Sequence, residues 1–397
     1  MKANIQTTGG ISSQRELIWP NILFFAITTL AALIGCPLYL RRFGISPSEI
    51  SLFAFYTVAT GLSITAGYHR LFSHAAYKAN PLVQFFFLFF GAAAFEQSAL
   101  DWSSQHRDHH RYVDTYRDPY SIQKGFFYAH IGWLIFWKHV INYDNVRDLQ
   151  KNALVMSQSR HYHLWAVTAG ILTPLLLGAA GGHALGAFLF SICLRLTVVY
   201  HSTFCINSVC HKFGKATYDI YASARDHWLV AFITNGEGYH NFHHRFPGDY
   251  RNGVRWYQWD PTKWLIAILH YGGLTWDLKR ISSYRILEAR LAAENQSVQD
   301  SLRKELDLTR LPHLMEALNL RYGQLKEILF RWEEATKEYQ RLAHAQVMRR
   351  SKKLNAACHI RMREGRKQFK KLYGEWHFLI QRRPCDLQRL LLPAGGV

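Results

Sequence analysis

Long uncharged stretches alternate with histidine-rich polar stretches along the first two-thirds of the chain. Residues 17–40 and residues 50–68 contain no charged side chain. Each stretch is long enough to cross a hydrocarbon core of about 30 Å as a helix. Residues 163–182 and 183–206 form a second apolar pair, divided by Gly181 and Gly182. The pattern predicts an all-α membrane protein with four transmembrane spans.

Two features of the apolar pattern need separate treatment. Residues 81–95 are apolar but too short for a full crossing, which favours a re-entrant or interfacial segment. Arg195 is the one charge within the fourth span, and we expect it to face protein or water because its burial in lipid is costly. Residues 1–16 lack the features of a cleaved signal peptide, so we expect the first span to remain in the mature protein.

The distribution of cations predicts the sidedness. Residues 69–162 hold ten Lys and Arg residues, whereas the third and fourth spans are joined by two glycines. Because cation-rich loops stay cytoplasmic, residues 69–162 and 207–280 are predicted to form one cytoplasmic cap on a membrane domain of residues 17–280.

Residues 281–397 form a charged and mainly helical extension. Its apolar positions are too irregular to indicate a long coiled coil, so a solvated helical tail is the simplest interpretation, with membrane-surface or partner binding as the alternative. The net charge of the chain is +19, and residues 341–397 carry 14 Lys and Arg against 3 Asp and Glu. On a membrane protein this favours contact with anionic lipids, and we expect no nucleic-acid partner.

Histidines carry the candidate chemistry. Eight of 21 fall into three clusters: His69 with His74; His106 with His109 and His110; and His240 with His243 and His244. Spacing of i, i+3, i+4 places imidazoles on one helical face. The first pair, at i, i+5, is not expected to share a face, with His69 on the last turn of a span and His74 just beyond. So many imidazoles exceed the needs of one zinc ion and suit two adjacent irons.

The clusters lie in longer motifs. These read Gly-Tyr-His-Arg-Leu-Phe-Ser-His at 67–74, His-Arg-Asp-His-His at 106–110, Asn-Ser-Val-Cys-His at 207–211 and Gly-Glu-Gly-Tyr-His-Asn-Phe-His-His-Arg-Phe-Pro at 236–247. Over residues 50–260 the chain resembles membrane fatty acid desaturases, and within them the acyl-CoA, stearoyl-type delta-9 branch. The resemblance implies that His211 is a ninth imidazole ligand and that Asn207 holds a metal-bound water. It also implies O2-dependent formation of a cis double bond in an acyl chain by a di-iron centre.

Other residues are assigned supporting roles, and no catalytic residue is expected beyond the metal ligands. By position in the family, Trp102, Thr203 and Phe204 shape the acyl channel, or else belong to ordinary packing. Gly61 and Thr57 precede His69 by two and three turns, where small side chains suit a longer acyl chain. Five carboxylates are candidates either to orient ligands or to form surface ion pairs: Asp101, Asp108, Asp114, Asp118 and Glu237.

The carrier and the electron source stay open. Residues 102–105 lack the cation that the animal branch places near the CoA phosphates, so CoA, acyl carrier protein and a glycerolipid are alternatives, with CoA favoured. No haem, iron–sulfur or nucleotide-binding motif occurs, which predicts an external ferredoxin-like or cytochrome b5-like donor and favours a bacterial inner membrane over the endoplasmic reticulum. A related hydroxylase and a non-catalytic scaffold acting through its tail are the competing interpretations.

Overall fold

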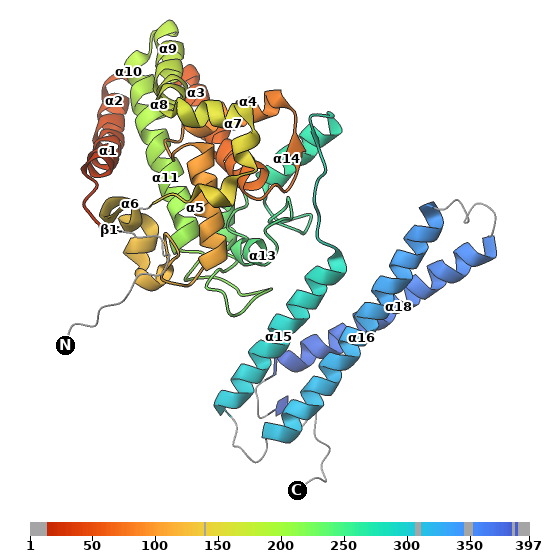
Figure 1. Cartoon of the computed structure of the whole chain (residues 1–397). Coiled ribbons are helices and arrows are strands. Elements are labelled where there is room, and N and C mark those ends of the chain that lie inside the picture. The colour runs from red at the N-terminus through yellow and green to blue at the C-terminus, as the bar shows by residue number, and fades with distance from the viewer. Residues whose placement is uncertain (1–13, 139, 306–310, 345–351, 383–385, 388–397) are drawn as a thin grey trace. The chain divides into compact units, whose positions relative to one another are not determined.

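The computed structural model of the chain describes residues 14–138, 140–305, 311–344, 352–382, 386 and 387. It divides into two units, Met1–Ala216 with Tyr221–Arg280 and Thr217–Ile220 with Ile281–Val397 (Figure 1). Most of the predicted N-terminal segment, residues 1–13, lies outside the described residues. Each unit is described by itself.

Four helices in the described part are long and apolar enough to span a membrane: Trp19–Phe43, Pro47–Ser73, Tyr162–Ala180 and Ala184–Ser208. Each is a run of consecutive helical segments. The first span joins α1 (Trp19–Leu30), η1 (Ala31–Gly35) and α2 (Cys36–Phe43), and the second span joins α3 (Pro47–Leu62) and η2 (Ser63–Ser73). The third span joins α8 (Tyr162–Val167), η7 (Thr168–Leu172) and α9 (Thr173–Ala180). The fourth span joins α10 (Ala184–Gly186), η8 (Ala187–Leu194) and α11 (Arg195–Ser208). The predicted all-helical fold with four spans is confirmed.

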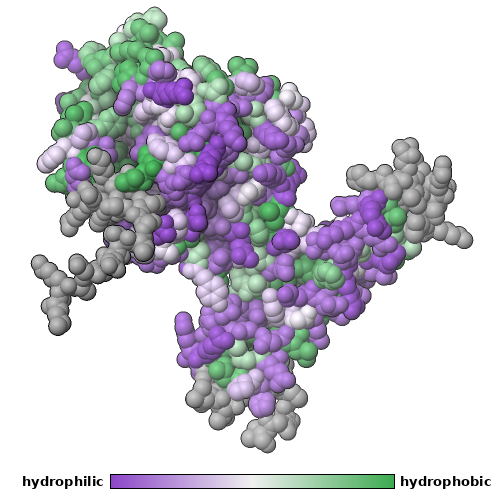
Figure 2. All heavy atoms as spheres, in the orientation of Figure 1, coloured by the Kyte–Doolittle hydropathy of each residue, from purple (hydrophilic) through white to green (hydrophobic). Residues whose placement is uncertain are grey.

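The surface of the spans is apolar. Side chains such as Ile27, Leu33 and Leu176 are 61%, 66% and 67% exposed. Figure 2 shows hydrophobic residues gathered at the end of the N-terminal unit where α1, α2, α9 and α10 lie. Exposed apolar surface of this extent is unfavourable in water, and it suits a hydrocarbon environment.

Arg195 is fully buried among protein atoms, as expected. Its guanidinium donates to the carbonyl oxygens of Ser191, Ala93 and Gly170 and to the hydroxyl of Thr60. These acceptors belong to four separate segments of the chain. A buried charge is tolerated when its donors are satisfied, so Arg195 ties the fourth span to the rest of the bundle.

The short apolar helix α4 (Pro81–Ala92) packs closely against η2. With 12 residues it is too short to cross a bilayer. A Cβ atom on Gly67 would lie 2.5 Å from Phe87, and one on Gly91 would lie 2.3 Å from Tyr68. The two glycines therefore allow the backbones of η2 and α4 to approach, which fixes the segment that carries His69.

The rest of the N-terminal unit forms the polar cap. Its helices are α5 (Ala99–Tyr112), η3 (Ile122–Lys124), η4 (Tyr128–Gly132), α6 (Trp133–Phe136), η5 (Tyr143–Val146), η6 (Leu149–Lys151), α7 (Ala153–Arg160), α12 (Trp228–Ile233), α13 (His240–Arg245) and α14 (Pro261–Tyr271). Two short antiparallel pairs join distant segments: β1 (Gln14–Arg15) with β3 (Trp137–Lys138), and β2 (Lys78–Ala79) with β4 (Thr275–Trp276).

The C-terminal unit contains α15 (Ser283–Glu305), α16 (Leu311–His344) and α18 (Lys352–Ile380). Leu291, Leu318, Leu329, Phe369 and Trp376 are among the residues of a buried cluster that all three helices share. The extension is mainly helical as expected, but its helices pack into a bundle with a core of its own, which the interpretation as a solvated tail did not include. Apolar positions recur at alternating intervals of four and three along α18, but cysteine, methionine and glycine occupy several of them: Cys358, Met362, Gly365, Phe369, Leu372, Trp376 and Leu379.

Candidate metal centre

Nine histidines from four stretches of the N-terminal unit converge into two adjacent groups. One group contains His69, His74, His106, His110 and His243, and the other contains His109, His211, His240 and His244. Within each group the candidate ligand atoms lie within 4.8 Å of one another. The groups are neighbours, because the rings of His110 and His244 stack with centroids 4.3 Å apart.

The imidazoles face one another through their Nε2 atoms. His243 Nε2 lies 2.9 Å from both His69 Nε2 and His110 Nε2. His240 Nε2 lies 3.0 Å from both His211 Nε2 and His244 Nε2. Each nitrogen of a neutral imidazole carries either one proton or one lone pair. One Nε2 atom therefore cannot form a full hydrogen bond with each of two neighbouring Nε2 atoms. The arrangement is compatible with lone pairs that converge on a shared cation.

Each histidine triplet serves both groups. On α5, His106 and His110 are four residues apart and join the first group, while His109 joins the second. On α13, His240 and His244 join the second group and His243 the first. In each triplet the first and third histidines, four residues apart, belong to one group, and the middle histidine belongs to the other group. The spacing along one helical face does not reveal this division.

The expectation for His69 and His74 was wrong in one respect. The wide helical segment η2 ends with a hydrogen bond from the backbone N–H of His74 to the carbonyl of His69, at 3.1 Å. A five-residue hydrogen bond widens the turn, so residues at i and i+5 fall on the same side. Their rings lie 4.9 Å apart, and both belong to the first group.

Two of the five candidate carboxylates contact histidines of the groups directly. Glu237 Oε2 lies 2.8 Å from His69 Nδ1, and Asp118 Oδ1 lies 2.9 Å from His109 Nδ1. An N–H that donates to a carboxylate at Nδ1 leaves the lone pair on Nε2, facing the centre. These two carboxylates therefore orient one imidazole in each group.

The other three carboxylates make different contacts. Asp114 accepts from the backbone of Ser223, whose hydroxyl lies 2.6 Å from His211 Nδ1. Asp108 accepts from Asn145, and Asp101 accepts from Ser98 and Tyr143. Asp114 thus supports the centre indirectly, through Ser223 and His211. The contacts of Asp108 and Asp101 instead join parts of the cap to one another.

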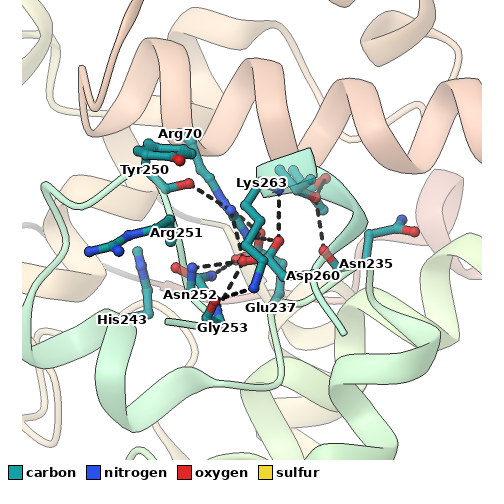
Figure 3. Close-up of polar contacts among 12 residues, drawn as sticks. Arg70, Asn235, Glu237, His243, Tyr250, Arg251, Asn252, Gly253, Asp260 and Lys263 are labelled. Carbon is teal, nitrogen blue, oxygen red and sulfur yellow. Dashed lines mark hydrogen bonds and ion pairs between the residues drawn. The ribbon is translucent and has the colours of Figure 1, made fainter. Parts of the chain in front are cut away.

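Glu237 is held by a fully buried ion-pair network, which Figure 3 shows. Arg70 Nη2 lies 2.9 Å from Glu237 Oε1 and 3.0 Å from Asp260 Oδ1. Asn252 donates to Glu237 Oε2 at 2.7 Å, and Asp260 also accepts from the backbone N–H of Lys263 at the start of α14. Burial alone would raise the pKa of Glu237, but the neighbouring His69 and Arg70 outweigh burial and lower it.

Seven of the nine imidazoles have pKa values well below the ordinary value. Burial is the main cause, and the neighbouring imidazoles and nearby arginines act in the same direction. The seven are His74, His106, His110, His211, His240, His243 and His244. Neutral imidazoles keep a free lone pair, so this site is suited to metal ions.

A cavity of about 280 Å³ adjoins the two groups. Its wall includes His69, His106, His109 and His240, together with Asn207 and all five residues assigned to the acyl channel: Trp102, Thr203, Phe204, Gly61 and Thr57. Trp102 lies flat on the ring of His106, with centroids 4.8 Å apart. The structure therefore brings the predicted ligands and the predicted channel residues into one place. Asn207 is on the cavity wall.

Glu96 is a cavity residue that the sequence analysis missed, because it lies outside every motif. Its carboxyl accepts from Trp102 Nε1 at 3.2 Å and from the Thr203 hydroxyl at 3.3 Å. It therefore joins two walls of the cavity. Burial raises the pKa of Glu96 to about 7, although both hydrogen bonds act in the opposite direction.

Fold and site together define a helical membrane protein with a histidine-rich site suited to metal ions. The sequence model of one protein family, described as fatty acid desaturase, matches residues 50–278 of this chain. The chain belongs to the fatty acid desaturase family.

Several relatives are similar over much of the chain. A probable acyl-CoA desaturase of Schizosaccharomyces pombe is 44% identical over 255 residues, 64% of this chain and 53% of the relative. Acyl-CoA desaturase 1 of Saccharomyces cerevisiae is 40% identical over 267 residues, 66% of this chain and 52% of the relative. Stearoyl-CoA desaturase 4 of Mus musculus is 35% identical over 301 residues, 71% of this chain and 81% of the relative. The chain thus matches about half the length of the two fungal relatives.

Replacing Glu237 with glutamine is expected to weaken metal binding. The substitution removes the negative charge that faces His69 and Arg70, and loss of such a support typically costs about 10–100-fold in metal affinity. The measurement is metal retained by the purified protein during dialysis against a chelator. Asp101→Asn is the matched control, because Asp101 contacts Ser98 and Tyr143. Equal retention by the two variants would contradict the role of Glu237.

Glu96→Gln is expected to flatten the dependence of stability on pH. The pKa of Glu96 is raised to about 7 in the folded chain, against about 4.3 in an unfolded chain. Between these values the folded chain holds a proton that the unfolded chain lacks, so stability falls as pH rises through this window. Thermal unfolding in detergent from pH 5 to pH 8 checks this. Parallel profiles for wild type and variant would disprove it, and Glu288→Gln on the exposed surface is the control.

Proposed function

We propose that the chain is an O2-dependent acyl-CoA desaturase that introduces a cis double bond at the delta-9 position, using two irons. The observation that carries the proposal is that imidazoles of both groups line a largely apolar cavity. An unactivated acyl chain offers no acidic or electrophilic atom, so its oxidation needs the chemistry of a metal with oxygen. The names of the relatives, which are acyl-CoA or stearoyl-CoA desaturases, agree with it.

The spacing of the imidazole nitrogens supports iron over zinc. Two nitrogens bound at about 2.1 Å to one ion lie about 3.0 Å apart at a right angle, but about 3.4 Å apart at a tetrahedral angle. Six Nε2–Nε2 pairs within the groups lie at hydrogen-bond distance, and five of them are 2.9 to 3.0 Å apart, whereas the sixth, between His109 and His244, is 3.3 Å apart. Right angles belong to six-coordinate or five-coordinate ions, which iron forms readily.

The residues that would hold the irons are the nine histidines, with Asn207 contributing through a water: His69, His74, His106, His109, His110, His211, His240, His243, His244 and Asn207. Bound iron would supply, with O2, an oxidant able to remove hydrogen from an alkyl chain. The protein's part is to hold the imidazoles neutral and oriented and to keep water away. Glu237 and Asp118 would orient the imidazoles, and burial of the site would keep water away.

The acyl chain would occupy the cavity. Trp102 forms a flat wall over His106, and Thr203 and Phe204 come from α11 on the same wall of the cavity as Asn207. Glu96 holds Trp102 and Thr203 together, so the channel keeps its shape next to the centre. Thr57 and Gly61 on α3 would close the distal end, and their small size suits a long chain.

CoA is the proposed carrier, because the relatives are named for it. The residues Trp102-Ser103-Ser104-Gln105 contain no cation for its phosphates, so acyl carrier protein and a glycerolipid are the alternative carriers. Electrons would come from a separate ferredoxin-like or cytochrome b5-like protein. The cation-rich cap supports a centre on the cytoplasmic side of the membrane, because cation-rich loops stay cytoplasmic. The sequence favours a bacterial inner membrane, whereas the relatives named above come from fungi and a mammal.

The decisive experiment expresses the chain in a host without its own desaturase, with an electron donor supplied. New monounsaturated acyl chains are expected by gas chromatography and mass spectrometry, and the position of the double bond reports the regiochemistry. His240→Ala is expected to abolish them, because His240 contacts two other imidazoles of its group. His163→Ala is the matched control, since His163 is exposed and outside both groups.

Other outcomes of the same experiment separate the competing functions. Hydroxylated acyl chains would replace the desaturase by a hydroxylase of the same metal class. Unchanged lipids from folded, iron-loaded protein would favour a scaffold.

Enlarging Gly61 is expected to shorten the preferred substrate. A Cβ atom on Gly61 would already lie 2.9 Å from Asn235 Nδ2, and Gly61 and Asn235 both line the cavity, so leucine there is expected to reduce its volume. Discrimination against the longer chain by about tenfold needs only about 1.4 kcal/mol. The ratio of shorter to longer monounsaturated products measures it. Ala54→Leu, on the exposed face of the same helix, serves as control, and an unchanged ratio in Gly61→Leu would place the end of the channel elsewhere.

A further inference from the structure

The C-terminal unit presents one strongly basic helix face. Among the α18 residues whose side chains are described, the exposed cations are Arg361, Arg363, Arg366, Lys367, Lys370 and Lys371. At about 100° per residue, all but Arg361 fall within about 140° of the helix circumference. The exposed acids of α18, Glu364 and Glu375, lie outside this sector. We call Arg363, Arg366, Lys367, Lys370 and Lys371 the basic stripe.

The stripe faces away from the core of its own unit. The opposite side of α18 carries Phe369 and Trp376, which are 3% and 1% exposed. Glu294 of α15 accepts from Trp376 Nε1 and from the hydroxyl of Tyr373. These contacts fix the rotation of α18 about its axis, so the stripe is held outward by the packing of the bundle.

The stripe is unpaired, unlike many of the cations on the other two helices. Ion pairs join Arg290 to Glu294, Arg303 to Asp300, Arg331 to Glu327 and Lys337 to Glu333 and Glu334. On α18, Arg361 pairs with Glu338. Within the described residues, no ion pair occurs for the five members of the stripe. Their charges are therefore available to an external anion.

Two large apolar side chains flank the stripe on the same face. Ile360 is 53% exposed and Phe378 is 52% exposed. The face from Ile360 to Phe378 is about 27 Å long at 1.5 Å per residue. Cations with apolar side chains on one exposed helix face are typical of helices that bind the surface of anionic membranes.

We propose that the basic stripe of α18 binds the anionic headgroups of the bilayer in which the spans are embedded. Ile281, where this unit begins, follows Arg280 of the membrane-spanning unit directly. The stripe is therefore covalently linked to a unit that spans the bilayer, and such a link raises the effective concentration of headgroups above that of a soluble partner. The flanking Ile360 and Phe378 suit the boundary between headgroups and acyl chains. This role is independent of the proposed catalysis.

The test uses the full chain in nanodiscs, with a fluorophore at Gly374→Cys. Gly374 lies within the sector of the stripe, and a Cβ atom there meets nothing within 4 Å. The matched site is Gly323→Cys on α16, which is equally open. Quenching by headgroup-attached nitroxide lipid is compared between phosphatidylcholine discs and discs with about one-third phosphatidylglycerol. The unsubstituted chain, labelled in parallel, gives the background from native cysteines.

Quenching at position 374 is expected to rise at least about twofold in anionic discs and to fall again at high salt. It should be lost when Arg363, Lys367, Lys370 and Lys371 are changed to glutamine. It should persist when four exposed cations on α15 and α16 lose the same charge, through substitution of Arg285, Lys304, Arg321 and Lys326 by glutamine.

Three results would overturn the proposal. The first is equal quenching at position 374 in neutral and anionic discs. The second is an equal loss of quenching in the two glutamine variants, which would indicate net charge and not the stripe. The third is an emission change at position 374 that follows only addition of an acidic ferredoxin, which would make the stripe a site for a protein. The salt titration of the unsubstituted stripe tests the proposal without any change of its charge.

Discussion

The geometry of the centre depends on one constraint: nine imidazoles must keep their lone pairs turned toward two adjacent points. The histidines come from four separate stretches between His69 and His244, so no local element can satisfy this alone. Close packing of η2 on α4 at Gly67 and Gly91 fixes one stretch. The Arg70–Glu237–Asp260 network then joins η2 to the segment before α13 and to the start of α14. Buried charge pairs of this kind tolerate little displacement, which suits a site that needs fixed angles.

Much of the fold and of the candidate site can be predicted from the sequence, because strong local patterns determine it. Uncharged stretches specify the four spans, and clustered histidines specify the residues that meet. The division of each triplet between two groups is not legible, since it depends on the angle at which α5 and α13 face each other. The shared face of His69 and His74 depends on a five-residue hydrogen bond that spacing alone does not reveal. Glu96 and Ser223 act through tertiary contacts and have no motif.

The C-terminal unit shows a different limit of sequence reasoning. Intervals of four and three are present along α18, yet Cys358, Met362 and Gly365 hold positions where leucine would make the pattern obvious. Gly365 is explained by its partner, because a Cβ atom there would lie 3.2 Å from Trp332. A large aromatic side chain on α16 thus takes the room that a small residue on α18 leaves. Such complementarity between helices appears only when both are in place.

Arg195 has a consequence for how the protein is made. Three groups outside its own helix accept hydrogen bonds from Arg195. They belong to Thr60, Ala93 and Gly170, all of which precede Arg195 in the chain. When the ribosome delivers the fourth span, the acceptors for its charge have therefore already been synthesised. The guanidinium can pass from the aqueous translocation channel to protein partners without residing in lipid. Biogenesis thus runs in the order that the charge requires, and a reordered or split chain would have to insert this helix before its acceptors exist.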